Sequence, residues 1–106
     1  MAMHKSDIEY EVLRNFEDNP NLTQRQMAKE LGLSLGKTNY VIRALVDKGW
    51  VKLQNFKRSD KKLGYIYLLT PEGMSERSAL ARDFLRRKSE EYNKLKEEIE
   101  ILKREL

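Results

Sequence analysis

A chain of 106 residues has room for one compact domain of about 70 residues and one appendage. Hydrophobic residues make up 40% of the sequence and charged residues 36%, so a modest core is expected and disorder throughout is not. The absence of cysteine excludes disulfides, thiolate zinc sites and cysteine nucleophiles. The sequence has no apolar run of about 18 residues, and residues 1–6 lack the apolar stretch of a signal peptide, so we expect a cytoplasmic protein.

The net charge of +4 is concentrated in the middle of the chain. Residues 71–106 carry nine basic and nine acidic side chains, and residues 1–33 have a net charge of −2. Residues 34–64 carry eight basic side chains against two acidic ones, a net charge of +6. A basic region on an otherwise balanced protein is typical of proteins that bind a polyanion, although an ordinary solvated surface can carry the same charge.

The first predicted helix covers residues 7–18. Ser6 and Glu9 have the spacing of a capping box, and apolar residues then recur at every third or fourth position. The helix is expected to stop at Asn19 and Pro20, because this pair favours a turn and the proline disfavours helix in the residue before it.

A second, shorter helix is predicted over residues 24–31. Thr23 and Gln26 form another capping box in front of it, and Gly32 can take the left-handed conformation that ends it. Ser34 is a good N-cap for a further helix that starts only two residues later, so two helices are joined by a tight turn.

The third predicted helix, residues 35–48, has two distinct faces. One face would be buried and contains Thr38, Val41, Ile42 and Leu45. The opposite face is polar and cationic and contains Gly36, Lys37, Asn39, Tyr40 and Arg43.

Two β-prone segments, residues 50–56 and 65–70, follow as a hairpin with a charged tip between them. Thr70 can cap a last helix with Pro71 in its first position, and this helix could exceed thirty residues. The elements predict a mainly α fold of the α+β winged helix type: a three-helix helix-turn-helix core with a two-stranded wing, followed by a long C-terminal coiled-coil helix. We expect a winged helix-turn-helix DNA-binding domain over residues 1–70 and a dimerisation helix over residues 71–106.

In such a domain the second helix of the helix-turn-helix enters the DNA major groove. Asn39 could then pair with an adenine edge, Arg43 with a guanine or a phosphate, and Tyr40 with a thymine methyl or a phosphate. Gly36 would permit close approach to the DNA backbone. Phosphate contacts are predicted for Ser34, Lys37, Gln24 and Arg25, because helix N-termini favour anions. A solvated helix face is the alternative interpretation of these positions.

The predicted wing carries four bases at its tip, Lys57, Arg58, Lys61 and Lys62, offset by one acid. A tip with this charge suits a minor groove or its flanking phosphates, and the alternative is a charged loop without such a partner.

The tail has a heptad repeat. Position a is filled by Leu85, Tyr92, Ile99 and Leu106, and position d by Ala81, Lys88, Leu95 and Leu102. We call Leu85, Tyr92, Leu95, Ile99, Leu102 and Leu106 the heptad stripe and predict that it forms a homodimer. Glutamates at g and lysines at e favour a parallel pair, and Lys88 interrupts the repeat or marks where the helix leaves the domain. The alternative is a helix that folds back on its own domain, as expected near its start for Met74, Leu80 and Phe84.

Three segments carry a family resemblance: LSLGKTNYVIRALVDKGWVKLQNF, GYIYLLTPEG and EEYNKLKEEIEIL. Over nearly the whole chain they resemble the MarR-type regulators associated with exopolysaccharide gene clusters. The resemblance implies a dimeric repressor or activator with its recognition helix at residues 34–48 and a wing tip in the minor groove. Many MarR proteins carry Asp-x-Arg in the wing, where this chain has Asp60-Lys61-Lys62, so a point charge replaces the planar arginine fork. Typical members also hold an effector pocket between helices from both chain ends. This chain lacks that length, so no small-molecule effector is expected.

Other functions are less well supported by the sequence. The segment GLSLGKT has one residue too few for a phosphate-binding loop and follows a helix, and His4 has no nominated catalytic partner. We therefore predict no enzyme, no cofactor, no metal site and no membrane partner. An interaction module, in which the winged domain binds protein and the coiled coil organises an assembly, remains the main alternative. RNA binding ranks third, because few exposed aromatic residues are placed for base stacking.

Overall fold

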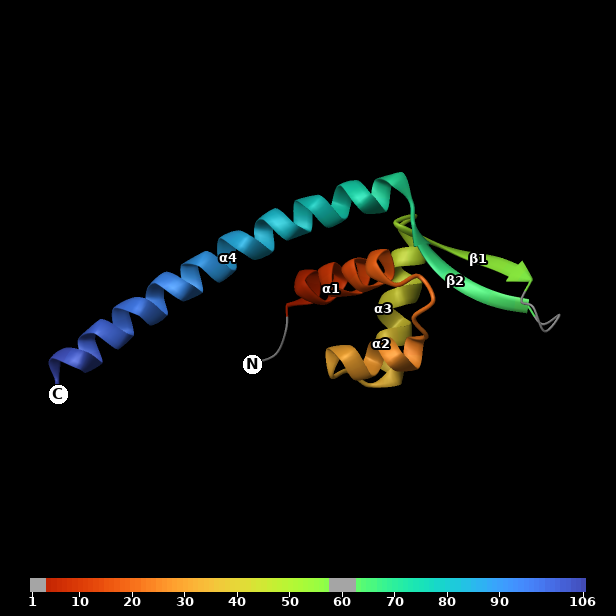
Figure 1. The fold of residues 1–106 in the computed structure, drawn as a ribbon. Coiled ribbons are helices and arrows are strands. Elements are labelled where there is room, and N and C mark those ends of the chain that lie inside the picture. The colour runs from red at the N-terminus through yellow and green to blue at the C-terminus, as the bar shows by residue number, and fades with distance from the viewer. Residues whose placement is uncertain (1–3, 58–62) are drawn as a thin grey trace.

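The computed structural model describes residues 4–57 and 63–106. Its elements are α1 (Lys5–Asp18), α2 (Gln24–Leu31), α3 (Leu35–Asp47), β1 (Val51–Lys57), β2 (Leu63–Leu69) and α4 (Pro71–Arg104). Figure 1 shows that α1, α2 and α3 cluster together, that the hairpin projects to one side, and that α4 passes along α1 and continues beyond it. The molecule is therefore elongated, with extents of 66 × 26 × 22 Å. The predicted order of elements is confirmed.

The core lies where the three short helices meet the base of the hairpin. Its largest fully buried side chains include Phe16 and Leu13 of α1, Met27 of α2 and Leu45 of α3. The inward face predicted for α3 is confirmed, since all four of its residues are buried. The one hydroxyl among them, on Thr38, donates to the Ser34 carbonyl (2.9 Å), so its burial leaves no hydrogen bond unmade.

Local capping signals define α2 and the start of α3. The Thr23 hydroxyl accepts from the Gln26 backbone N–H (3.1 Å) and the Gln26 side chain accepts from the Thr23 N–H (2.9 Å), which confirms the predicted capping box. Gly32 ends α2 with a φ of 66°, and Ser34 caps α3 by accepting from the Lys37 N–H (3.0 Å). The two helices are therefore joined by the predicted tight turn.

The capping box predicted at the start of α1 is wrong. The helix begins at Lys5, after His4, and His4 makes no side-chain cap. Ser6 and Glu9 lie inside the helix and use their side chains in tertiary contacts instead: the Ser6 hydroxyl accepts from Arg87 (3.4 Å) and Glu9 pairs with Lys48 (2.6 Å).

The hairpin is antiparallel, with Val51 opposite Leu69 and Leu53 opposite Tyr67. Val51 and Leu69 are buried, and the Tyr67 ring stacks on Phe16 with 4.8 Å between centroids. The strand face that contains these residues therefore packs on the helices, as the alternation of side chains along a strand requires. Both strands extend further toward the tip than predicted, because pairing continues to Lys57 and Leu63.

The start of α4 is fixed against the base of the hairpin. Thr70 accepts from the Gly73 N–H (3.0 Å), donates its hydroxyl to the Gly49 carbonyl (2.6 Å), and donates its backbone N–H to the Trp50 carbonyl (3.0 Å). A Cβ atom on Gly73 would lie 1.9 Å from the Trp50 carbonyl oxygen. Only glycine permits this approach, so the position constrains how α4 leaves the domain.

The first half of α4 packs on α1. Leu80 packs against the core, and Phe84 stacks on Tyr10 with 5.3 Å between centroids, as the fold-back alternative predicted for these two residues. Met74 does not fold back: it is 52% exposed, and at about 100° per residue it lies about 120° around α4 from Leu80.

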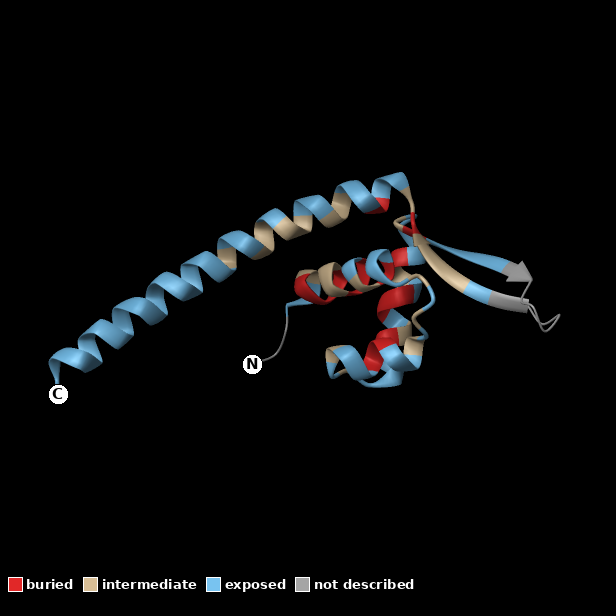
Figure 2. Cartoon of the chain, viewed as in Figure 1, coloured by how far each residue is buried: buried red, intermediate tan, exposed pale blue. Residues whose placement is uncertain are grey.

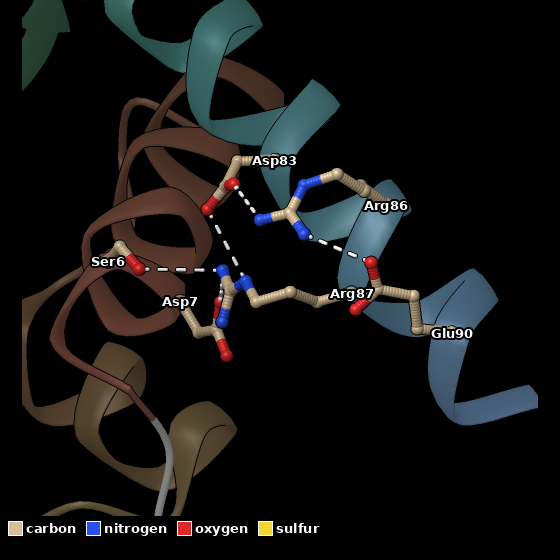
Figure 3. Close-up of polar contacts among 6 residues, drawn as sticks. All are labelled: Ser6, Asp7, Asp83, Arg86, Arg87 and Glu90. Carbon is tan, nitrogen blue, oxygen red and sulfur yellow. Dashed lines mark hydrogen bonds and ion pairs between the residues drawn. The ribbon is translucent and has the colours of Figure 1, made fainter. Parts of the chain in front are cut away.

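A polar network completes this junction (Figure 3). Arg87 pairs with Asp7 of α1 and with Asp83, while Arg86 joins Asp83 (2.9 Å) to Glu90 (3.1 Å). The hydrogen bond from Arg86 holds the pKa of the Asp83 carboxyl below its ordinary value, and the hydrogen bond to Asp7 raises the pKa of Arg87. Of these pairs, the one between Arg87 and Asp7 joins α4 to α1, whereas the others lie within α4.

Beyond this network, none of the described residues outside α4 covers the helix. Every residue from Lys88 to the C-terminus is exposed, as the pale blue half of the helix in Figure 2 shows. The helix therefore leaves the domain at Lys88, the position where the heptad repeat is interrupted.

Candidate nucleic-acid interface

The outward face of α3 is exposed and shallowly hollowed. A groove of about 380 Å³ is lined by Asn39, Tyr40, Arg43, Ala44 and Asp47. Tyr40 is 65% exposed, and the ammonium group of Lys37 lies 5.5 Å from the centre of its ring. The structure therefore brings Lys37, Tyr40 and Arg43 together on one open surface, as a helix that enters a groove of DNA requires.

Gly36 lies near the start of this surface in open space, since a Cβ there would meet no atom within 4 Å. Arg25, the second residue of α2, is exposed, and its predicted phosphate contact remains a prediction. The hydroxyl oxygen of Ser34 accepts the Lys37 N–H in capping α3, which leaves its O–H as a donor. Of these positions, Arg25 is the one that presents an exposed cationic side chain.

Gln24 and Asn39 are half-buried and hydrogen-bonded to each other. Asn39 Nδ2 donates to Gln24 Oε1 (2.9 Å), and Gln24 Nε2 donates to the Tyr67 hydroxyl (2.9 Å). This chain connects α3, α2 and the hairpin. Both amides were predicted to contact DNA independently, whereas the structure places them in one network.

The wing is described only up to its strands. Lys57 is the last residue of β1, and Arg58, Lys61 and Lys62 lie outside the described residues. Their predicted contacts with the minor groove remain predictions.

Not every base in the cationic region belongs to the outward face of α3. Lys48, at the end of the helix, pairs with Glu9 of α1 (2.6 Å), and its ammonium group lies 4.5 Å from the centre of the Trp50 ring. The charge available to a polyanion near α3 is therefore smaller than the count along the sequence indicates.

Sequence reasoning missed two residues that shape this region. Tyr67 was assigned only to a strand, although the alternation of Tyr65, Tyr67 and Leu69 places it on the face toward the helices. The close approach of Gly73 to Trp50 was not predicted, because nothing in the neighbouring sequence indicated it.

The heptad stripe forms a second exposed surface. Its six residues are all exposed, with Leu85 at 66% and Tyr92 at 64%. The residues of α4 that pack on the domain lie on another side of the helix: at about 100° per residue, Leu80 and Arg87 are about 140° and 160° around it from Leu85. The domain therefore leaves the stripe uncovered.

Within the described ranges, no group of three or more histidine, cysteine, aspartate or glutamate residues is placed to hold a metal ion. None of the described helices is long and apolar enough to cross a membrane.

Residues 5–52 match a protein family described as winged helix-turn-helix DNA-binding. This segment contains α1, α2, α3 and the start of β1, and the wing and α4 follow it. The fold is a winged helix. No curated protein sequence matches the chain.

Solved structures with the same fold include several MarR-family regulators. The PcaV transcriptional regulator from Streptomyces coelicolor, in complex with its natural ligand, is 23% identical with a TM-score of 0.59, over 74% of this chain and 54% of that one. A MarR/EmrR family regulator from Acinetobacter sp. ADP1 is 16% identical with a TM-score of 0.63, over 77% and 56%. A MarR variant from E. coli complexed with operator DNA is 24% identical with a TM-score of 0.54, over 70% and 51%. This winged helix chain spans about half the length of each.

Proposed function

We propose that this winged helix protein is a sequence-specific regulator of transcription that binds duplex DNA as a homodimer. The observation that carries the proposal is the open face of α3, where Lys37, Tyr40 and Arg43 gather on the helix that follows the tight turn. In helix-turn-helix domains this second helix lies in the major groove. The match of residues 5–52 to a DNA-binding family and the likeness of the fold to a regulator solved with operator DNA support the same conclusion.

The roles on α3 follow from the chemistry of each side chain. Arg43 is exposed near the middle of the groove-lining face, and a guanidinium can donate two hydrogen bonds to guanine. Near the helix N-termini, the ammonium group of Lys37 and the planar guanidinium group of Arg25 offer positive charge for phosphates. Arg43 is therefore assigned to base readout, and Lys37 and Arg25 to phosphate contacts.

Replacing Arg43 by alanine tests this assignment. The variant should bind its specific site more weakly by about 1 to 3 kcal/mol, while binding to random DNA changes much less. Arg14→Ala is the matched control, because Arg14 is an exposed arginine on α1 whose ion pairs to Glu11 (3.8 Å) and Asp18 (3.9 Å) are long. An equal loss by Arg43→Ala on specific and random DNA would show that Arg43 contacts phosphate alone.

The proposed dimer interface is the heptad stripe of a second copy of this chain. Exposed apolar residues at a and d positions are typical of a coiled coil. The charges at g (Glu91 and Glu98) are opposite to those at e (Lys96 and Lys103), so they match in a parallel pair. Parallel helices would place both winged domains at the same end, where two recognition helices can read a two-fold symmetric site.

Two isoleucines on α4 provide a matched test of the interface. Ile99 lies on the stripe and is 44% exposed, whereas Ile101 lies off it and is 52% exposed. Ile99→Asp should give monomers in analytical ultracentrifugation, and Ile101→Asp should remain dimeric. Dimers that persist in Ile99→Asp would place the interface elsewhere.

The polarity of the pair can be tested by oxidation, because the chain has no cysteine of its own. In a parallel dimer Leu85→Cys faces its own copy and should form an intermolecular disulfide, since the Cα atoms of paired cysteines must lie within about 7 Å. In an antiparallel dimer the same cysteine lies far from its copy and stays reduced. Ile101→Cys is the control that should stay reduced in both cases.

A regulator of this kind acts in the cytoplasm, where the DNA of a bacterium lies. The resemblance to exopolysaccharide-associated regulators makes the genes of exopolysaccharide synthesis the first targets to examine. If the protein binds no DNA sequence preferentially, the interaction-module alternative takes the place of this proposal.

A further inference from the structure

A chain of two hydrogen bonds connects the wing to the recognition helix. It starts at the Tyr67 hydroxyl on β2, passes through the side-chain amide of Gln24 at the first position of α2, and ends at the side-chain amide of Asn39 on α3 (2.9 Å for each bond). All three side chains are half-buried. Tyr67 and Gln24 also line a hollow of about 200 Å³ that lies between α3 and the hairpin and that includes Arg43. These two hydrogen bonds therefore lie at the edge of the surface proposed to face DNA.

The Tyr67 end of this hydrogen-bonded series is held by the core. The Tyr67 ring stacks on Phe16, which is 1% exposed, so the position of the hydroxyl is fixed by a buried aromatic pair. Gln24 lies inside the capping box that Thr23 and Gln26 form at the start of α2, so its backbone is fixed as well. A polar group held by such supporting contacts loses less conformational freedom on binding than a free side chain does.

The hydrogen bond to Gln24 determines which groups of the Asn39 amide are still available to bind a base. An amide has two N–H donors and one carbonyl acceptor, and one N–H of Asn39 is used by Gln24. The remaining N–H and Oδ1 form a donor and acceptor pair, which complements the N7 and N6 groups of adenine in the major groove.

We infer that Tyr67 and Gln24 are positioning residues that hold the Asn39 amide in the orientation that reads adenine. The inference rests on the proposed function, because it assigns a base to a helix proposed to enter the major groove. It gives Gln24 a role different from the phosphate contact predicted from the sequence. It also makes Tyr67, a residue of the wing strand, a determinant of base preference through Asn39.

The test is in-vitro selection from random duplex DNA with the full chain and its variants. The unmodified protein should select a site with an adenine in each half whose preference Asn39→Ala abolishes. Tyr67→Phe keeps the ring stacked on Phe16 and removes only the hydroxyl. It should weaken the adenine preference at that position by about fivefold, the factor that corresponds to one neutral hydrogen bond. Gln24→Met, which preserves length but removes the amide, should weaken it at least as much.

Tyr65→Phe is the matched control. Tyr65 lies two residues away on the same strand face and is 58% exposed, so the same loss of a hydroxyl should leave the adenine preference intact. Melting temperatures of all variants identify any general loss of folding, which would weaken every position of the site alike.

A double-mutant comparison separates positioning from direct contact, because the Tyr67 hydroxyl could also donate to a phosphate. In the Asn39→Ala background Tyr67→Phe should have no further effect on any base preference or on overall affinity. A loss of affinity in that background, or an unchanged adenine preference in Tyr67→Phe alone, overturns the inference and leaves the proposed function standing. An Asn39→Ala variant with every base preference intact also overturns the inference and leaves the proposed function standing. Failure of the unmodified protein to select any site overturns both.

Discussion

The approach of Gly73 to Trp50 gives the sharpest stability prediction. A Cβ at position 73 would lie 1.9 Å from the Trp50 carbonyl oxygen, and real contacts of this kind stay above 3.0 Å, so Gly73→Ala must separate the two backbones by about 1 Å. The same carbonyl accepts the Thr70 N–H (3.0 Å), and that bond would be strained or lost. The substitution therefore acts on the point where α4 is attached to the hairpin.

The expected magnitude combines three effects. Overpacking costs about 1 to 3 kcal/mol, the lost hydrogen bond costs about 1 kcal/mol, and the better helix propensity of alanine returns up to about 1 kcal/mol. Gly73→Ala should thus lower the free energy of unfolding by about 1 to 3 kcal/mol. Gly36→Ala is the matched control in α3, where a Cβ meets nothing within 4 Å, and it should raise the same free energy by roughly 0.5 to 1 kcal/mol.

The assay is urea and thermal unfolding at one fixed protein concentration, because dimerisation makes the midpoint concentration-dependent. Fluorescence is a suitable signal, since the single tryptophan, Trp50, lies at the site. The two variants should shift the melting temperature in opposite directions, by about 4–8 °C for each kcal/mol. A Gly73→Ala variant as stable as the unmodified protein would refute the close approach.

Three further outcomes are expected. Thr23→Ala should lower the free energy of unfolding by about 1 kcal/mol, and Ser6→Ala by less than about 0.5 kcal/mol, because Thr23 caps α2 whereas Ser6 lies inside α1 and caps nothing there. The lowered pKa of the Asp83 carboxyl means that its stabilising effect is present above its ordinary value of 3.8 and is lost as the pH falls through the lowered value. The melting temperature of Asp83→Asn should therefore decrease less on acidification below about pH 4 than that of the unmodified protein. Replacing Lys61 and Lys62 by alanine should reduce the slope of log affinity against log salt by up to about two units, and an unchanged slope would remove the wing tip from the interface.

The sequence predicts elements well where their ends are set by neighbouring residues. The bounds of α2 and the left-handed conformation of Gly32 follow from contacts within a few positions, and both are confirmed. The buried face of α3 follows from helical periodicity alone and is also confirmed. Local chemistry and periodicity therefore account for most of the fold.

The predictions fail where the contacts of a side chain depend on residues far away in the sequence. The start of α1 was misplaced because the partner of Ser6 is 81 positions away, and the partner of Glu9 is 39 positions away. The hydrogen bond between Gln24 and Tyr67 spans 43 positions, so a single-residue reading of Gln24 could not include it. Exposed cationic positions such as Arg43 could be predicted, whereas the hydrogen bonds that join Asn39 to Gln24 and Tyr67 could not.

The central claim is that two copies of the α3 face read a specific DNA site. The most direct measurement is in-vitro selection of random duplex DNA by the purified chain, with the binding of the enriched pool repeated at two salt concentrations. A dimer that reads DNA through both α3 helices should enrich a site with two-fold symmetry whose affinity exceeds that of random DNA at both salt concentrations. A pool without enrichment, bound weakly and with a steep loss of affinity as salt rises, would contradict the account and leave only nonspecific electrostatic attraction.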